Sequence, residues 1–138
     1  MGKIMALDLG NRWIGSALSD SLKIIARPYK TVEREQLTCL IEETLQQEKI
    51  DAIVIGYPKT MGGRISEQTQ KVIDDYQALT VRFPAAQFVL WDERLSSKRA
   101  ADLSHARTHE EKQKSHSVAA AFILDSYLLF LAHHNPNL

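Results

Sequence analysis

The chain has 138 residues, of which 25% are charged and 44% are hydrophobic, and its formal net charge at pH 7 is zero. This length supports one domain with a single good core and is too short for two, so we treat residues 1–138 as one domain. A neutral chain neither requires nor excludes a nucleic-acid partner, because phosphate binding needs only a local group of basic side chains. The one cysteine excludes an internal disulfide and a CxxC metal site.

The apolar segments predict no membrane partner. No apolar run approaches the roughly 20 residues that are needed to cross a bilayer. The apolar run at the N-terminus is short and contains Asp8, which is unlike a secretory leader. We therefore expect a cytoplasmic protein.

The first half of the chain alternates apolar runs with turn residues. Gly10-Asn11-Arg12 separates two short strands, which predicts an opening hairpin. Leu37, Leu40, Ile41 and Leu45 then recur at the spacing of one helix face. The predicted elements are strands at 3–9, 13–19 and 23–32, a helix at 37–49 and a strand at 51–56.

The second half predicts a loop at 61–63, a helix that ends before Pro84 and a strand at 87–91. A short helix is expected after Ser96-Ser97, a loop at 104–115 and an apolar helix at 117–133. A hairpin followed by strand–helix units is typical of an α/β fold. We expect a five-stranded mixed sheet, with its first three strands antiparallel and helices on both faces.

Two of the apolar strands end in acidic residues. Asp8 lies near the end of the first strand, and Asp92 and Glu93 follow the fifth. A carboxylate in a buried strand costs free energy unless a cation or hydrogen bonds compensate it. The carboxyl ends of these strands should open on one side of the sheet, so Asp8 can share a divalent ion with Asp92 or Glu93. Oxygen ligands favour Mg²⁺ or Mn²⁺, and such ions serve phosphodiester hydrolysis.

Each acidic site also has a simpler interpretation. An aspartate before a glycine at a strand end is common turn chemistry, and Asp92-Glu93-Arg94 could be a surface ion-pair cluster. The two sites together, in this strand order, favour a metal site. Gly10 and Gly15 lack side chains near Asp8, which we expect to let a polyanionic backbone approach.

Basic side chains are concentrated after the fifth predicted strand. A basic loop beside a carboxylate site suits a phosphate backbone, although the acidic residues among them also fit a solvated loop of mixed charge. Together with Gly10, the candidate nucleic-acid-binding residues are Arg94, Lys98, Arg99, Lys112 and Lys114.

Four groups of residues form a recognisable combination over nearly the whole chain. They are Leu7-Asp8-Leu9-Gly10 with Gly15, Gly56-Tyr57-Pro58 with Met61 and Gly63, Asp92-Glu93-Arg94-Leu95-Ser96-Ser97, and Ala119-Ala120 with Ile123-Leu124 and Tyr127-Leu128. Together they resemble the YqgF/RuvX family. The resemblance implies an RNase H-like fold and a Holliday-junction-resolvase-like nuclease that matures the 5′ end of pre-16S rRNA. It also implies that Asp8 and Glu93 bind metal, with Asp92 and Arg94 supporting them.

One position departs from the family pattern, which places an aspartate at the start of the last helix. Alignment on Ala119-Ala120 puts His116 there, and Asp125 falls on the opposite helix face at about 100° per residue. A neutral imidazole can bind a divalent ion but is softer and uncharged, which favours Mn²⁺. His116 could instead act as an acid or base, or the site could be weak or inactive.

Three functions stay open. A metal-dependent nuclease acting on structured RNA, with Asp8, Glu93 and His116 as catalytic residues, fits best. A resolvase-like DNA nuclease would apply the same chemistry to branched DNA and would require a homodimer with two active sites. A non-catalytic RNA- or ribosome-binding module would fit if His116 disables the site. An actin-like ATPase would need two such domains, and this length provides one.

Overall fold

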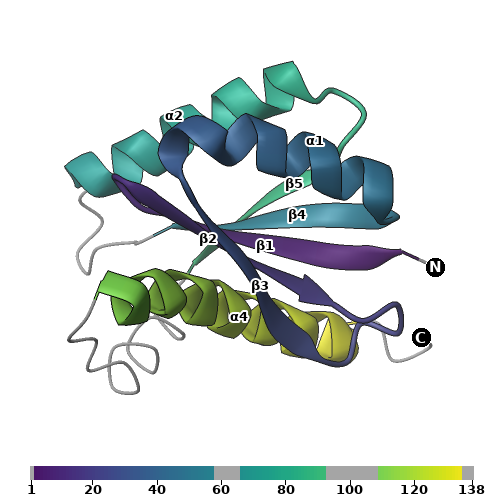
Figure 1. Cartoon of the computed structure of the whole chain (residues 1–138). Helices are drawn as coiled ribbons and strands as arrows, with labels where there is room; N and C mark the ends of the chain where they lie inside the picture. Colours follow the sequence, from purple (N-terminus) through teal and green to yellow (C-terminus); the bar gives the residue numbers. More distant parts are fainter. Residues whose placement is uncertain (1, 58–65, 93–108, 135–138) are drawn as a thin grey trace.

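The structure, a computed structural model, describes residues 2–57, 66–92 and 109–134, with the side chains of 116–133 in the last segment. It forms one five-stranded mixed sheet between two layers of helix (Figure 1). The elements are β1 (Lys3–Leu9), β2 (Trp13–Ser19), β3 (Ala26–Glu33), the 3₁₀ turn η1 (Arg34–Gln36), α1 (Leu37–Gln47), β4 (Ile50–Tyr57), α2 (Glu67–Arg82), β5 (Phe88–Asp92) and α4 (His109–His134).

The strand β1 lies at the centre of the sheet. The strand order is β3-β2-β1-β4-β5. The pairs β1–β2 and β2–β3 are antiparallel, whereas β4 runs parallel to β1 and β5 runs parallel to β4. The predicted opening hairpin, mixed sheet and antiparallel first three strands are confirmed. The carboxyl ends of β1, β4 and β5 therefore meet at one edge, where α/β folds place their sites.

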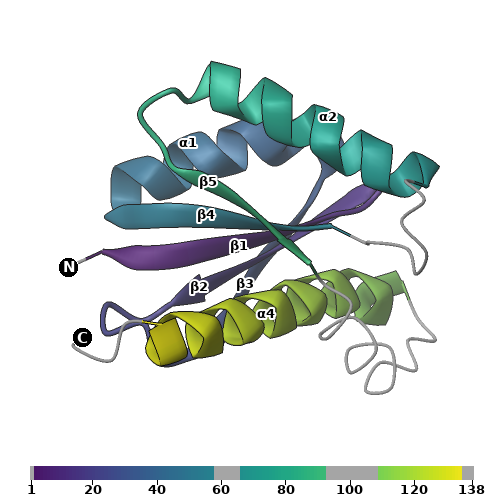
Figure 2. The same cartoon turned by 180° about the vertical axis from the view of Figure 1, so that it is seen from behind.

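Each face of the sheet has its own hydrophobic core. The helices α1 and α2 cover one face and α4 covers the other, as Figure 2 shows from behind. Because side chains alternate along a strand, β1 sends Met5, Leu7 and Leu9 into the core under α1 and α2. It sends Ile4 and Ala6 into the core under α4. This alternation decides which helix layer each site residue meets.

The start of α4 corrects one prediction. A loop was expected at 104–115, but α4 begins at His109. The residues 109–115 have no apolar period, which is why they read as a loop. They contain Glu, Lys and Gln, which favour a helix without needing a buried face. The third strand likewise begins at Ala26 rather than at residue 23. The predicted loop at 61–63 and the short helix after Ser97 lie outside the described residues.

Helix α4 also corrects the expectation that no apolar run approaches the length needed to cross a bilayer. Within the described helices, one segment, His116–His133, is long and apolar enough to cross a membrane by length and composition. This segment lies along the sheet and buries one side there. The buried side consists of Ala120, Ile123, Leu124, Tyr127 and Leu128. The apolar composition of α4 is thus explained by its place in the core.

Candidate active site

Asp8 lies near the carboxyl end of the central strand, on the face that α4 covers. It shares this face with Ile4 and Ala6, because alternate residues of a strand point the same way. Its side chain is 22% exposed, so the carboxylate is partly desolvated and still reachable from solvent. A carboxylate in this position needs a cation or hydrogen-bond donors to compensate for its lost hydration.

The helix α4 crosses the sheet at the row of residues that contains Asp8. Asp8 pairs with Gly15 on β2, and Gly15 pairs with Thr31 on β3. The hydroxyl of Thr31 is hydrogen-bonded to that of Ser117 on α4. His116, the preceding residue, is thereby placed over Gly15 and beside Asp8.

Gly15 is required by this crossing. A Cβ built at Gly15 would overlap the main-chain carbonyl of His116 and the main-chain nitrogen of Ser117. The expectation that Gly15 opens a path for a polyanionic backbone is therefore wrong, because helix backbone fills that space. At Gly10 a Cβ would lie 2.6 Å from the carbonyl oxygen of Trp13 and 3.2 Å from Cε1 of His116. Gly15 thus allows the main chain of α4 to pack closely on β2, and Gly10 allows the imidazole of His116 to pack closely on the turn.

The imidazole of His116 faces the carboxylate of Asp8. Nδ1 of His116 lies 3.4 Å from Oδ2 of Asp8, which is slightly longer than an ideal hydrogen bond. The His116 side chain is 30% exposed. Two groups that can each bind a cation or exchange a proton thus converge at the end of β1, although they are 108 positions apart in sequence.

Asp92 lies at the same edge of the sheet but belongs to the other face. Leu7 is paired with Ile55, and Ile55 with Leu90, so the ends of β1 and β5 are level. Asp92 has the same strand parity as Phe88 and Leu90, which pack in the core under α1 and α2. Asp92, the last residue of β5, thus lies on the face opposite Asp8, which does not favour the expected sharing of one ion by Asp8 and Asp92.

Most of the other predicted site residues cannot be placed. Glu93, Arg94, Lys98 and Arg99 lie outside the described residues. Lys112 and Lys114 lie in the first turns of α4, where only the backbone is described. The basic group that was predicted to bind phosphate therefore stays a prediction.

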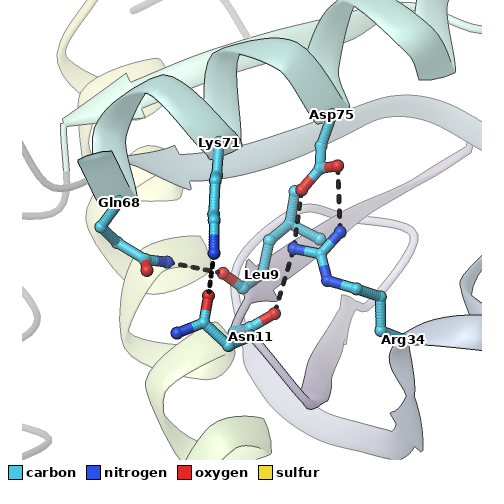
Figure 3. Close-up of polar contacts among 7 residues, drawn as sticks. Leu9, Asn11, Arg34, Gln68, Lys71 and Asp75 are labelled. Atoms are coloured by element: carbon cyan, nitrogen blue, oxygen red, sulfur yellow. Dashed lines mark hydrogen bonds and ion pairs between the residues drawn. The ribbon is translucent and has the colours of Figure 1, made fainter. Parts of the chain in front are cut away.

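Three polar side chains that sequence reasoning missed hold the turn after Asp8. Arg34 and Gln68 donate hydrogen bonds to the carbonyl oxygens of Gly10 and Leu9, and Lys71 donates one to the side chain of Asn11 (Figure 3). For Gln68 and Lys71 the signal in the sequence is that positions 68 and 71 share one helix face, which does not distinguish them from solvated polar residues.

The described donors are compatible with part of a divalent-metal site. A carboxylate and an imidazole converge, and both are ligand types of Mn²⁺ and related ions. Within the described residues no group of three His, Cys, Asp or Glu side chains converges in this way. Asp8 and His116 would therefore supply two ligands, and the further acid expected from the sequence, Glu93, lies outside the described part.

Comparison with known sequences gives consistent matches over nearly the whole chain. The family model described as "RuvX: Holliday junction resolvase" matches residues 2–129. A Rubrobacter xylanophilus protein named "Putative pre-16S rRNA nuclease" is 34% identical over 128 residues, which cover 92% of each chain. A Desulfitobacterium hafniense protein of the same name is 37% identical over 140 residues, with 96% of each chain covered.

Comparison with solved structures supports the fold. The chain is similar to Thermus thermophilus RuvC in complex with a Holliday junction substrate, with a TM-score of 0.65 and 14% identity over 97% of each chain. A second Thermus thermophilus RuvC structure gives a TM-score of 0.60 and 15% identity over 96% of each chain. At this identity the likeness concerns the RNase H-like architecture alone.

Proposed function

The chain belongs to the RuvX family, and from this premise we propose that it is a metal-dependent nuclease that hydrolyses RNA phosphodiester bonds in the 5′-end processing of pre-16S rRNA. The observation that carries the proposal is the convergence of Asp8 and His116 at the end of the central strand. The relatives named as pre-16S rRNA nucleases support structured RNA as the proposed substrate.

The proposed site combines residues from β1, from the segment after β5 and from α4. Asp8 and Glu93 would hold Mg²⁺ or Mn²⁺ with Arg94 supporting them, whereas Asp92 lies on the opposite face of the sheet. When bound, the ion would lower the pKa of an attacking water and stabilise charge on the leaving oxygen. His116 would complete or tune the site, since its ring nitrogen faces the Asp8 carboxylate and limits the orientations of that side chain.

The RNA backbone would be bound beside this site by Gly10, Arg94, Lys98, Arg99, Lys112 and Lys114. Cationic side chains would contact phosphate oxygens and position the strand without reading its sequence. The proposed compartment is the cytoplasm, where ribosomal RNA precursors are processed.

The test is cleavage of a structured pre-rRNA 5′ leader with Mg²⁺ and then with Mn²⁺. Asp8→Asn removes the charge and keeps the shape, so we expect it to reduce cleavage by at least roughly 10- to 100-fold. Asp125→Asn is the matched control, because Asp125 lies on α4 beside Ala26 and Phe122, away from Asp8. We expect it to cleave like the wild type. Unchanged cleavage by Asp8→Asn would contradict the proposal.

A second candidate is a nuclease for branched DNA, which the family description and the RuvC-like fold favour. Symmetric cutting of a junction needs two active sites, so this candidate requires a homodimer. Light scattering at the assay concentration, together with cleavage of a four-way DNA junction, distinguishes the two. A monomer that cuts only RNA would exclude the DNA reading.

His116 motivates a third candidate, a binding module whose nuclease activity has lapsed. Its signature is a wild type that binds RNA without cleaving it and a His116→Asp variant that does cleave. A wild type that cleaves, with activity lost in Asp8→Asn, would exclude it.

A further inference from the structure

The turn that follows Asp8 is contacted on both sides by one residue, Arg34 of η1. The main-chain N–H of Arg34 donates to the carbonyl oxygen of Arg12, at 2.9 Å. Its Nη2 donates to the carbonyl oxygen of Gly10, at 3.1 Å. Arg34 therefore spans the turn between β1 and β2, two residues beyond the carboxylate of Asp8.

The guanidinium of Arg34 is itself fixed by a bidentate ion pair to α2. Nη1 and Nη2 lie 3.0 and 2.8 Å from the two carboxylate oxygens of Asp75 (Figure 3). The two side chains are 33% and 23% exposed, so the pair is only partly screened by water. A bidentate pair constrains orientation as well as distance, which a single contact does not.

Two further residues of α2 bind the same turn. Gln68 Nε2 donates to the carbonyl oxygen of Leu9 at 3.3 Å, and Lys71 Nζ lies 3.4 Å from Oδ1 of Asn11. A cavity of about 400 Å³ adjoins these contacts, lined by Asn11, Arg34, Lys71, Asp74 and Asp75. Its lining holds two cationic and two anionic side chains, so the charges balance and the cavity does not favour an anion. The arrangement is suited to bracing the turn.

We propose that Arg34, held by Asp75, is a positioning residue that fixes the β1–β2 turn and with it the carboxylate of Asp8. The proposal rests on the proposed nuclease function for its catalytic consequence, but the bracing itself can be measured without RNA or metal. It adds a connection between α2 and the site that lies outside the expected metal ligands and phosphate-binding residues.

The test uses two variants and a matched control. Arg34→Gln removes the guanidinium, and Asp75→Asn leaves Arg34 in place while removing its ionic partner. Arg82→Gln is the control, because Arg82 also joins α2 to another helix through an ion pair, to Glu42 at 2.9 Å. That pair joins α2 to Glu42 of α1 rather than to the turn after Asp8.

The first readout is hydrogen exchange of the Gly10 amide, which donates to the carbonyl oxygen of Trp13 at 3.1 Å. We expect exchange to be roughly tenfold faster in Arg34→Gln and Asp75→Asn, and unchanged in Arg82→Gln.

The second readout is RNA cleavage. We expect kcat to fall roughly 10- to 100-fold with KM nearly unchanged, because misplacing a catalytic group affects the transition state. Arg34→Lys keeps the charge and loses the bidentate geometry. Its Gly10 exchange rate and its kcat should lie between those of the wild type and Arg34→Gln.

Each alternative outcome is decisive. Unchanged Gly10 exchange in both Arg34→Gln and Asp75→Asn would overturn the bracing, whether or not the protein cleaves RNA. Faster exchange with an unchanged kcat would overturn the positioning role. A wild type that cleaves no RNA would overturn the proposed function and its catalytic consequence, while the exchange data would still decide whether Arg34 braces the turn.

Discussion

Gly15 and His116 determine each other's positions. The helix backbone at His116 lies directly over Gly15, which brings the imidazole within reach of Asp8 on the neighbouring strand. The absence of one side chain on β2 thus allows a residue of α4 to meet a residue of β1. The pair depends on main-chain packing as much as on the chemistry of the two side chains.

We expect Gly15→Ala to be destabilising. The added Cβ would overlap main-chain atoms of His116 and Ser117, which cannot rotate away as a flexible side chain could. Overpacking of this kind costs about 1–3 kcal/mol or more. Urea denaturation should therefore show a lower free energy of unfolding.

The control for this prediction is the same change in a His116→Ala background. Because the overlap is with the main chain, Gly15→Ala should cost about as much there. A Gly15→Ala protein as stable as the wild type would mean that α4 does not cross the sheet at this row.

At the scale of elements, the β2–β3 hairpin depends on one aspartate. Oδ1 of Asp20 accepts hydrogen bonds from the main-chain N–H groups of Ile24 and Ile25, at 2.8 and 2.9 Å. These hydrogen bonds, the one from Ile25 first, lower the pKa of Asp20 below its ordinary value of 3.8. The turn also contains Lys23 with φ of 59°, so it is not a conformation that the backbone adopts unaided.

This shift predicts a pH dependence. The folded pKa of Asp20 lies below the unfolded value, so the carboxylate stabilises the folded state above pH 3.8 and loses this effect as the pH falls through the folded pKa. Asp20→Ala should therefore melt at a lower Tm than the wild type at neutral pH, with the difference shrinking at about pH 3. Calorimetry at the two pH values checks this, and a difference that grows on acidification would contradict it.

Elements with a buried apolar period can be predicted from the sequence, and polar ones cannot. The period places β1, β4 and α1 within a few residues of their observed bounds, and it places the end of α2 before Pro84. It fails for the first two turns of α4, where 109–115 favour a helix through intrinsic propensity. The sequence places His116 near Asp8 only through the family resemblance, because the row at which α4 crosses the sheet depends on main-chain packing over Gly15. The pair of Arg34 with Asp75 joins residues 41 positions apart, and it depends on the angle at which α2 crosses the sheet.

The whole molecule is organised around a sheet whose central strand belongs to both cores. Met5 and Leu7 pack under α1 and α2, while Ile4 and Ala6 pack under α4. The strands carry one core on each face. Loss of α4 would therefore expose one face of these strands to water. The two layers should therefore unfold together, although they do not touch through the sheet.

Leu124→Ala tests this coupling. Leu124 is fully buried under α4, and its truncation should lower the free energy of unfolding by about 2–5 kcal/mol. Leu129 lies on the same helix but is 56% exposed, so Leu129→Ala should change the free energy of unfolding by less than about 0.5 kcal/mol.

The fluorescence of Trp91 reports on α4 in a Trp13→Phe background, because its indole N–H donates a hydrogen bond to Ser126 of that helix. In both variants the unfolding transition followed by this fluorescence should coincide with the one followed by far-UV circular dichroism. An earlier fluorescence transition would mean that α4 separates from the sheet while the other layer stays folded.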